Sequence, residues 1–173
     1  MTGHELTLRP ARPSDEAVVR IAHESLAADD DFDFAMGLQP DTDWADHLQM
    51  YDDVQHGRDL LESWVPATFL LAEMADEVVG RTSIRHELND WLEQFGGHIG
   101  YAVLPEFRRR GFASEILRQS LVVARSVGVG RVLVTCDDGN VASARVIERN
   151  GGALENIVDD PDSSIRKRRY WID

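Results

Sequence analysis

Residues 98–117, HIGYAVLPEFRRRGFASEIL, combine an apolar strand, a basic turn and the start of a helix. Pro105 ends the strand, and Gly111 lacks the Cβ that would hinder a tight turn into the helix. The N–H groups at a helix N-terminus attract anions, and Ala113 keeps the surface there small. The R-x-x-G-x-A spacing from Arg108 therefore fits a pyrophosphate site and, equally well, a solvated basic turn.

The hydrophobic pattern predicts helices and strands on both sides of this stretch. Apolar residues at a spacing of three and four indicate helices, whereas short alternating or apolar runs bounded by turn residues indicate strands. This order predicts an α/β, or α+β, fold with a mixed sheet and a β-α-β unit at 98–136. The expected elements are a strand at 6–9, a helix from an N-cap at Ser14 to about Leu26, a helix from Trp44 to before Gly57, a hairpin of 67–73 and 78–85, an 11-residue connection at 86–96, strands at 97–104 and 131–136, helices at 111–127 and from Asn140 to Gly151, and strands at 153–158 and 165–172.

The length of 173 residues predicts one domain, residues 1–173, with enough chain to bury a core. With 43% hydrophobic and 28% charged residues, the composition excludes collagen-like, disordered and membrane-spanning classes. The first residues lack the apolar run of a secretory signal. A single cysteine, Cys136, excludes an internal disulfide, and its apolar strand favours a core position. We therefore expect a cytoplasmic protein.

The net charge of −13 is unevenly distributed. Residues 1–105 carry 6 basic and 21 acidic side chains, whereas residues 106–173 carry 12 and 10. An acidic whole argues against nucleic-acid binding, which needs clustered Lys and Arg. The acidic half, with Asp29 to Asp33 between two helices, predicts a cationic substrate beside an anionic cofactor, although a solvated acidic surface explains it equally well.

Two segments in this order resemble the GCN5-related N-acetyltransferase (GNAT) superfamily. HIGYAVLPEFRRRGFASEIL is similar to the fourth strand and acyl-CoA motif, and residues 132–152, VLVTCDDGNVASARVIERNGG, to the fifth strand and following helix of the ribosomal-protein and small-molecule branch. The resemblance implies a sheet splayed between strands four and five, and direct acetyl transfer from acetyl-CoA to an amine. The cofactor-binding residues that it implies are Tyr101, Ala102, Val103, Arg108, Arg109, Arg110, Gly111, Phe112, Ala113, Asn140 and Ser143.

The sequence departs from the family at the proton donor. Many members carry a tyrosine in the helix after strand five that protonates the leaving thiolate, and the aligned position here is Ile147. Ser143, which matches the serine of the N-x-x-S pattern, is the substitute candidate, and a helix N-terminal serine that bonds only the backbone is the alternative.

The general base is predicted near the start of strand four. A carboxylate or imidazole must take a proton from the acceptor ammonium, often through water. His98 is the first candidate and Glu87 the second, with His86 beside them. The six histidines show no metal-ligand spacing, so no metal is expected.

The expected partner is a small-molecule or peptide amine, with neither nucleic acid nor membrane, and a homodimer is one assembly to test. Two other functions remain open at this point. A catalytically silent acyl-CoA sensor fits the missing tyrosine, and the same cofactor motif would serve a transferase of another acyl group.

Overall fold

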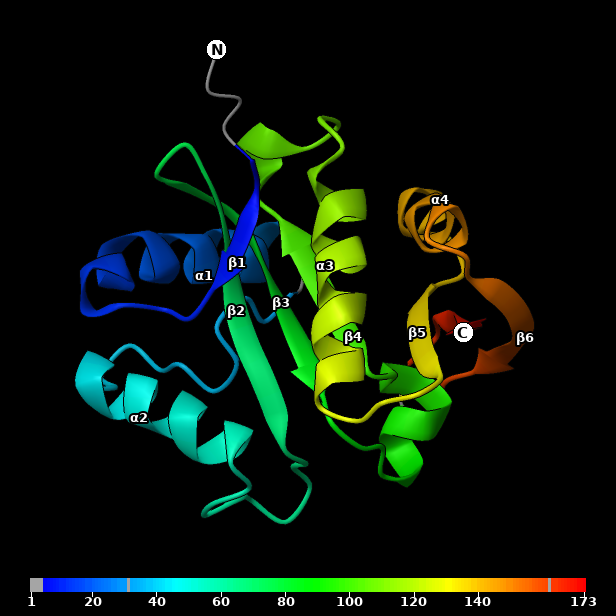
Figure 1. Ribbon diagram of the computed structural model, residues 1–173, viewed down its shortest axis with the longest axis horizontal. Coiled ribbons are helices and arrows are strands. Elements are labelled where there is room, and N and C mark those ends of the chain that lie inside the picture. The colour runs from blue at the N-terminus through cyan, green and yellow to red at the C-terminus, as the bar shows by residue number, and fades with distance from the viewer. Residues whose placement is uncertain (1–4, 31, 162) are drawn as a thin grey trace.

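The computed structural model describes residues 5–30, 32–161 and 163–173 and contains two antiparallel sheets with helices around them (Figure 1). One sheet has the order β1-β2-β3-β4 and the other β5-β7-β6. The elements are β1 (Thr7–Arg9), α1 (Glu16–Asp30), α2 (Trp44–Gln55), β2 (Ala67–Met74), β3 (Glu77–Arg85), β4 (Ile99–Val103), α3 (Phe112–Ser126), β5 (Val132–Asp137), α4 (Val141–Arg149), β6 (Ala153–Asp159) and β7 (Arg166–Ile172).

The two faces of the first sheet carry different helices, as Figure 1 shows for α1 and α2 on one side and α3 on the other. Because side chains alternate along a strand, Thr82 of β3 points toward α3, where the Ser120 hydroxyl donates to its Oγ1 at 2.9 Å. Arg81 and Ser83 face the opposite way, toward α1 and α2. The aromatic residues Tyr51 and Phe69 stack on that face with ring centroids 4.2 Å apart.

β4 and β5 meet only at one end. The His98 N–H donates to the Leu133 carbonyl at 2.7 Å, and the Leu133 N–H donates to His98 Nδ1 at 2.9 Å. Gly97 allows this approach, because a Cβ there would lie 2.7 Å from the Leu133 oxygen and its φ is +66°. In the described residues no ladder joins the two strands beyond this point. The β4–β5 splay and the antiparallel sheets flanked by helices confirm the predicted fold class.

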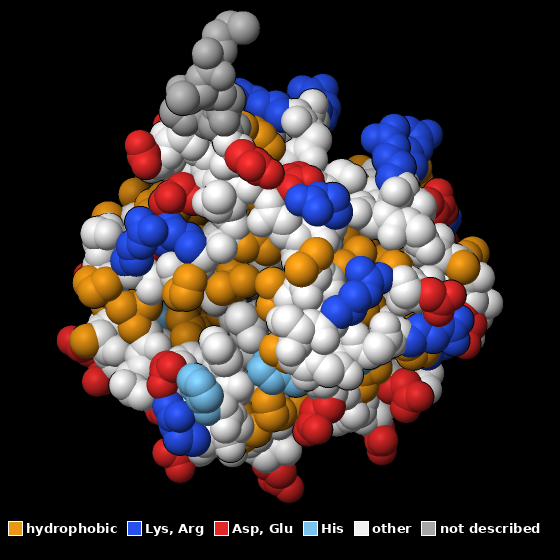
Figure 2. Space-filling view, in the orientation of Figure 1, with side chains coloured by type: hydrophobic (Ala, Val, Ile, Leu, Met, Phe, Trp, Pro, Cys, Tyr) orange, Lys and Arg blue, Asp and Glu red, His pale blue; other side chains and the backbone are white. Residues whose placement is uncertain are grey.

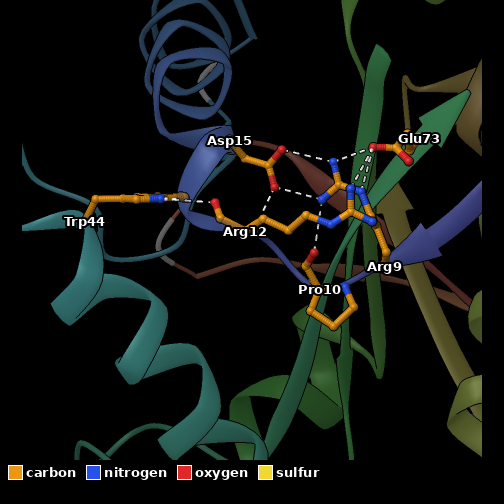
Figure 3. Close-up of polar contacts among 6 residues, drawn as sticks. All are labelled: Arg9, Pro10, Arg12, Asp15, Trp44 and Glu73. Atoms are coloured by element: carbon orange, nitrogen blue, oxygen red, sulfur yellow. Dashed lines mark hydrogen bonds and ion pairs between the residues drawn. The ribbon is translucent and has the colours of Figure 1, made fainter. Parts of the chain in front are cut away.

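A polar network fixes the N-terminal strand against the start of α1 (Figure 3). The Arg9 guanidinium bonds Asp15 at 2.7 Å and Glu73 of β2 at 2.7 Å, and the Arg12 N–H donates to Asp15 at 2.6 Å. Trp44 of α2 donates its indole N–H to the Arg12 carbonyl at 3.2 Å. One carboxylate thus holds both a strand and a helical turn in place.

This network corrects the predicted helix start. Pro13 opens a 3-10 turn, Pro13–Asp15, so Ser14 lies inside that turn and is not the N-cap. The first helix also continues past Leu26 to Asp30. At the start of this turn the Asp15 carboxylate accepts the Arg12 N–H.

The connection before β4, the length of β4 and the order of the second sheet also differ from the sequence prediction. The 86–96 connection contains a π-helical turn, Leu92–Gly96, and β4 is shorter than its predicted strand. In the second sheet the last strand, β7, inserts between β5 and β6, so the predicted terminal hairpin is present but β5 pairs with its second strand. No helix of the described residues is long and apolar enough to cross a membrane.

Candidate active site

The exposed edge of β4 lines the β4–β5 splay. Within the β3–β4 ladder the Arg85 N–H donates to the His98 carbonyl and the Leu104 N–H to the Val79 carbonyl. Since antiparallel ladders alternate, the main-chain groups of Tyr101 and Val103 point away from β3, toward the splay. Tyr101 is partly exposed although it lies within a sheet strand. The edge therefore offers main-chain donors and acceptors to an extended ligand.

The turn before α3 presents N–H groups at one end of this edge. Arg109 and Gly111 have positive φ angles of 62° and 86°, and α3 begins at the next residue, Phe112. A Cβ on Gly111 would meet nothing within 4 Å, so this turn is open to a ligand. Figure 2 shows Arg and Lys side chains over this end of the molecule. Accessible amides beside positive charge fit the predicted pyrophosphate site.

The three arginines of the turn have different surroundings. Arg108 donates from Nε to the Val103 carbonyl at 3.1 Å and pairs with Asp30 at the end of α1. Arg110 lies over the Phe107 ring, 5.5 Å from its centroid, and Arg109 is exposed. The Arg108 side chain thus ties the turn to β4 and α1, and the expected role of Arg108 in cofactor binding stays a prediction.

Tyr101 and Ser143 meet across the splay. The Tyr101 hydroxyl lies 2.9 Å from Ser143 Oγ, which joins β4 to the first turn of α4. Asn140 is the N-cap of α4, and its Oδ1 accepts the Ser143 N–H at 3.0 Å. The structure therefore brings together Tyr101, Asn140 and Ser143, which the sequence assigned to the cofactor site. The Ser143 hydroxyl, on α4, contacts the Tyr101 side chain of β4.

Burial keeps the polar groups of the splay protonated. Burial raises the pKa of the Tyr101 phenol to about 12, and the bond with Ser143 opposes this shift only in part. Burial likewise raises the pKa of the Cys136 thiol to about 11. Cys136 is 8% exposed and belongs to the main apolar cluster, as its strand pattern predicted. The Tyr101 phenol therefore stays protonated at physiological pH and can donate a hydrogen bond.

Ile147, at the position of the family tyrosine, has no exposed surface and packs in the core. The two other tyrosines are occupied elsewhere: Tyr51 packs on α2 against β2, and Tyr170 donates to Glu148 at 3.1 Å. From the sequence, Tyr101 was predicted only as a cofactor-binding residue, and its phenol was given no separate role. The sequence offered a signal for the phenol, because one of the three tyrosines of the chain, Tyr101, lies in the strand that resembles the acyl-CoA motif.

The candidate bases are not gathered around this pair. His98 Nδ1 accepts the Leu133 N–H, so a neutral imidazole carries its proton on Nε2, and burial lowers its pKa. His86 Nε2 lies 2.8 Å from Thr68 Oγ1, and Glu87 is exposed beyond the end of β3. Within the described residues no group of three or more His, Cys, Asp or Glu could hold a metal.

Comparisons with known proteins agree with this geometry. The model of the acetyltransferase (GNAT) domain matches residues 5–153. No curated protein matches the sequence significantly. Among solved structures, yncA of Salmonella typhimurium with its cofactor acetyl-CoA shares 16% identity over 96% of this chain and 92% of its own, with a TM-score of 0.65.

Two further solved structures carry ribosomal-protein acetyltransferase names. RimL, in complex with coenzyme A, shares 19% identity over 96% of this chain and 93% of its own, with a TM-score of 0.66. RimJ of Mycobacterium smegmatis shares 18% identity over 96% and 81%, with a TM-score of 0.69. At these identities the likeness shows the fold alone.

The family match covers most of the chain, so the protein belongs to the GNAT acetyltransferase family. By its family it is an N-acetyltransferase, and the yncA structure to which it is similar holds acetyl-CoA as its cofactor. The splayed strands, the open turn before α3 and the exposed edge of β4 are the features of this chain that fit the cosubstrate.

Proposed function

We propose that the protein transfers an acetyl group directly from acetyl-CoA to a primary amine of a small molecule or a peptide N-terminus, with Tyr101 as the proton donor to the departing sulfur. The hydrogen bond between the Tyr101 and Ser143 hydroxyls across the splay carries this proposal. It supplies a phenol from β4 where the family tyrosine of the following helix is absent.

Binding follows from the edge and the turn. The N–H groups of Gly111, Phe112 and Ala113 hold the pyrophosphate, and the outward main-chain groups of Tyr101 and Val103 pair with the pantetheine arm as an added strand would. Arg109 and Arg110 add positive charge at the turn. The main-chain N–H groups of β4 also polarise the thioester carbonyl, where negative charge develops during transfer.

Acetyl-CoA supplies the acetyl group as a thioester: the amine nitrogen forms the new bond to its carbonyl carbon, and the carbon–sulfur bond breaks. Tyr101 donates its proton to the sulfur as that bond breaks, so coenzyme A leaves as the thiol. Ser143 orients the phenol and returns a proton to it from solvent. The proton lost by the amine goes to a base or to water.

For that base, His98 and Glu87 stay predictions, and the structure supports neither. His98 uses Nδ1 to hold Leu133, which gives it a structural task at the joint of the two sheets. Glu87 is exposed, which suits a base that acts through water, but no described contact links it to Tyr101.

The test compares Tyr101→Phe and Ser143→Ala with the control Ser126→Ala, whose hydroxyl bonds the Val123 carbonyl at the far end of α3. Release of coenzyme A is measured with a panel of amines and corrected for hydrolysis. Loss of the proton donor should lower kcat by about 10²-fold or more, the usual range for an acid catalyst, with little change in the KM of acetyl-CoA. Unchanged kcat in Tyr101→Phe overturns the assignment.

The same assay separates the alternatives. A silent sensor would bind acetyl-CoA without turnover on any amine, and a transferase of another acyl group would prefer propionyl- or succinyl-CoA. A cationic acceptor, expected from the acidic first half, would show a KM that rises with salt. Asp31, at the centre of that acidic run, lies outside the described residues.

A further inference from the structure

Two arginines of β3 are buried or nearly buried without a carboxylate. Arg81 is 6% exposed, and Arg85 is partly buried two positions further along the same face. Neither forms an ion pair with a carboxylate of the described residues, whereas the comparably buried Arg9 and Arg169 pair with Asp15 and Glu155 respectively. A buried charge without a counterion is costly, so the two arginines lack the anion that would normally accompany them.

Both guanidinium groups donate to main-chain carbonyls. Arg81 bonds the Gly100 oxygen at 3.1 Å and the Asp33 oxygen at 2.6 Å. Arg85 bonds the Gly97 oxygen at 3.1 Å and the Gly96 oxygen at 3.3 Å. These carbonyls hold the side chains in position, but they leave the positive charges without a negative partner.

The two side chains flank the open face of Gly100. A Cβ on Gly100 would lie 3.8 Å from Arg85 Nη1 and 3.9 Å from Arg81 Nη1, with no other atom within 4 Å. Gly100 itself is partly exposed, although Arg81 and Ser83 beside it are buried. The absence of a side chain thus leaves space between two cations, next to Tyr101 in the chain.

Further polar atoms on this face also lack partners. Ser83, which lies opposite Gly100 in the ladder, has a buried Oγ with no hydrogen-bond partner among the described residues, and the same holds for Arg81 Nε. Buried polar groups are nearly always satisfied, so such a group calls for an explanation. A ligand oxygen over Gly100 would provide the missing acceptor.

Two aromatic rings lie against the Arg81 guanidinium. The Arg81 guanidinium lies 4.5 Å from the Phe32 centroid and 5.8 Å from that of Phe69. Burial lowers the pKa of Arg81 to about 10, helped by Arg85 and opposed by Tyr51 and Asp33, so Arg81 remains charged at neutral pH. Apolar surroundings strengthen the attraction of this charge for an anion.

We propose that Arg81 and Arg85 bind a carboxylate of the acceptor over Gly100, with the Ser83 hydroxyl as an additional donor. This inference rests on the proposed function, because it names the substrate class of the same site. Gly100 and Tyr101 are neighbours in β4 that face opposite sides of the sheet, so a carboxylate over Gly100 lies across one strand from the phenol. An amine held close to that carboxylate, as in a free amino acid, reaches the thioester through the β4–β5 splay. The acceptor is therefore an amino acid, in contrast to a polyamine or the N-terminus of a long peptide.

An amino acid carries the ammonium group expected of a cationic acceptor and, in addition, a carboxylate. The acidic side chains of the first half contribute a surface field, whereas the residues beside β4 that face the acceptor are positive. An amino acid satisfies both, since its ammonium group is attracted by the surface and its carboxylate by the two arginines.

The experiment measures kcat/KM for free amino acids, their neutral amides and spermidine. The expected result is a preference of at least about tenfold for an amino acid over its amide, because the amide leaves the guanidinium groups unpaired. Equal rates for acid and amide, or a preference for spermidine, overturn the carboxylate site and leave the proposed function intact.

Variants locate the site. Arg85→Gln and Ser83→Ala should raise the KM of the amino acid and reduce its advantage over the amide, while Arg118→Gln, an exposed arginine of α3 paired with Glu115, should change neither. Ser83→Ala removes a hydroxyl that has no hydrogen-bond partner in the described part of the chain, so the variant should fold normally. Unaltered discrimination in both site variants contradicts the proposal.

The melting temperature reports binding of the acceptor separately from acetyl transfer. An amino acid should raise the melting temperature of the wild-type protein more than its amide does, and this difference should shrink in Arg85→Gln. If no amine is acetylated while the difference persists, the proposed function fails and the carboxylate site stands. If neither compound changes the melting temperature at saturating acetyl-CoA, the carboxylate site fails.

Discussion

Replacement of Gly111 by valine tests the cofactor site, because the cost of the substitution to folding can be calculated separately from its effect on coenzyme A binding. Gly111 has a φ of +86°, a region that costs an L-residue roughly 1–2 kcal/mol, and a Cβ there meets nothing within 4 Å. For a chain of this size such a loss lowers the melting temperature by roughly 2–8 °C, so the variant should stay folded. The same Cβ stands where the pyrophosphate must approach the amides. Calorimetric titration should therefore show at least a tenfold weaker affinity for coenzyme A, about 1.4 kcal/mol.

Gly128, at the other end of α3, provides the matched control. Its φ is +94°, and a Cβ there also meets nothing within 4 Å. Gly128→Val should lose about the same stability and bind coenzyme A as the wild type does. If folded Gly111→Val binds coenzyme A as tightly as Gly128→Val, the turn before α3 does not hold the pyrophosphate, and the cofactor site has been placed wrongly.

Two histidines give further predictions. Burial lowers the pKa of His47 to about 4, so its contribution to stability is complete above the unfolded pKa near 6.5 and is lost as the pH falls toward 4. His47→Phe, which keeps an aromatic ring stacked on Trp44 and edge-on to Tyr51, should make the free energy of unfolding less sensitive to pH in that window, as measured by urea titration. His98→Ala should cost about 1–3 kcal/mol, because the buried Leu133 N–H loses its acceptor. It should change kcat only a few-fold, whereas a catalytic base would cost about 10²–10⁴-fold and remove the ascending limb of the pH profile.

The order of elements could be predicted because it is written in local signals. The 3.6-residue period of the helix after Gly111, the alternation of the 67–85 hairpin and the terminating Pro105 each depend on neighbouring residues. Boundaries were less accurate where a side chain from elsewhere competes. Ser14 was expected to cap α1, but Pro13 opens a 3-10 turn that includes Ser14, and Asp15, which Arg9 holds, accepts the Arg12 N–H at the start of that turn.

The site was only partly predictable, because its decisive contacts join distant segments. The backbone positions of the cofactor motif follow from its glycine and from the resemblance to the family. The phenol of Tyr101 does not, since its contact with Ser143 spans 42 residues and depends on the distance between β4 and α4. Strand alternation places Arg81 and Arg85 on one face, yet their lack of a carboxylate emerges only when the packing is known.

A crystal structure of the protein with coenzyme A bound tests the cofactor site and the proton donor together, because both are defined by geometry. The pyrophosphate should lie on the N–H groups of residues 111–113, the pantetheine arm along the outward edge of β4, and the thiol sulfur within hydrogen-bond reach of the Tyr101 hydroxyl, roughly 3.5 Å. Coenzyme A bound outside the β4–β5 splay, or a thiol directed away from Tyr101 with another proton donor beside it, would contradict the proposed site.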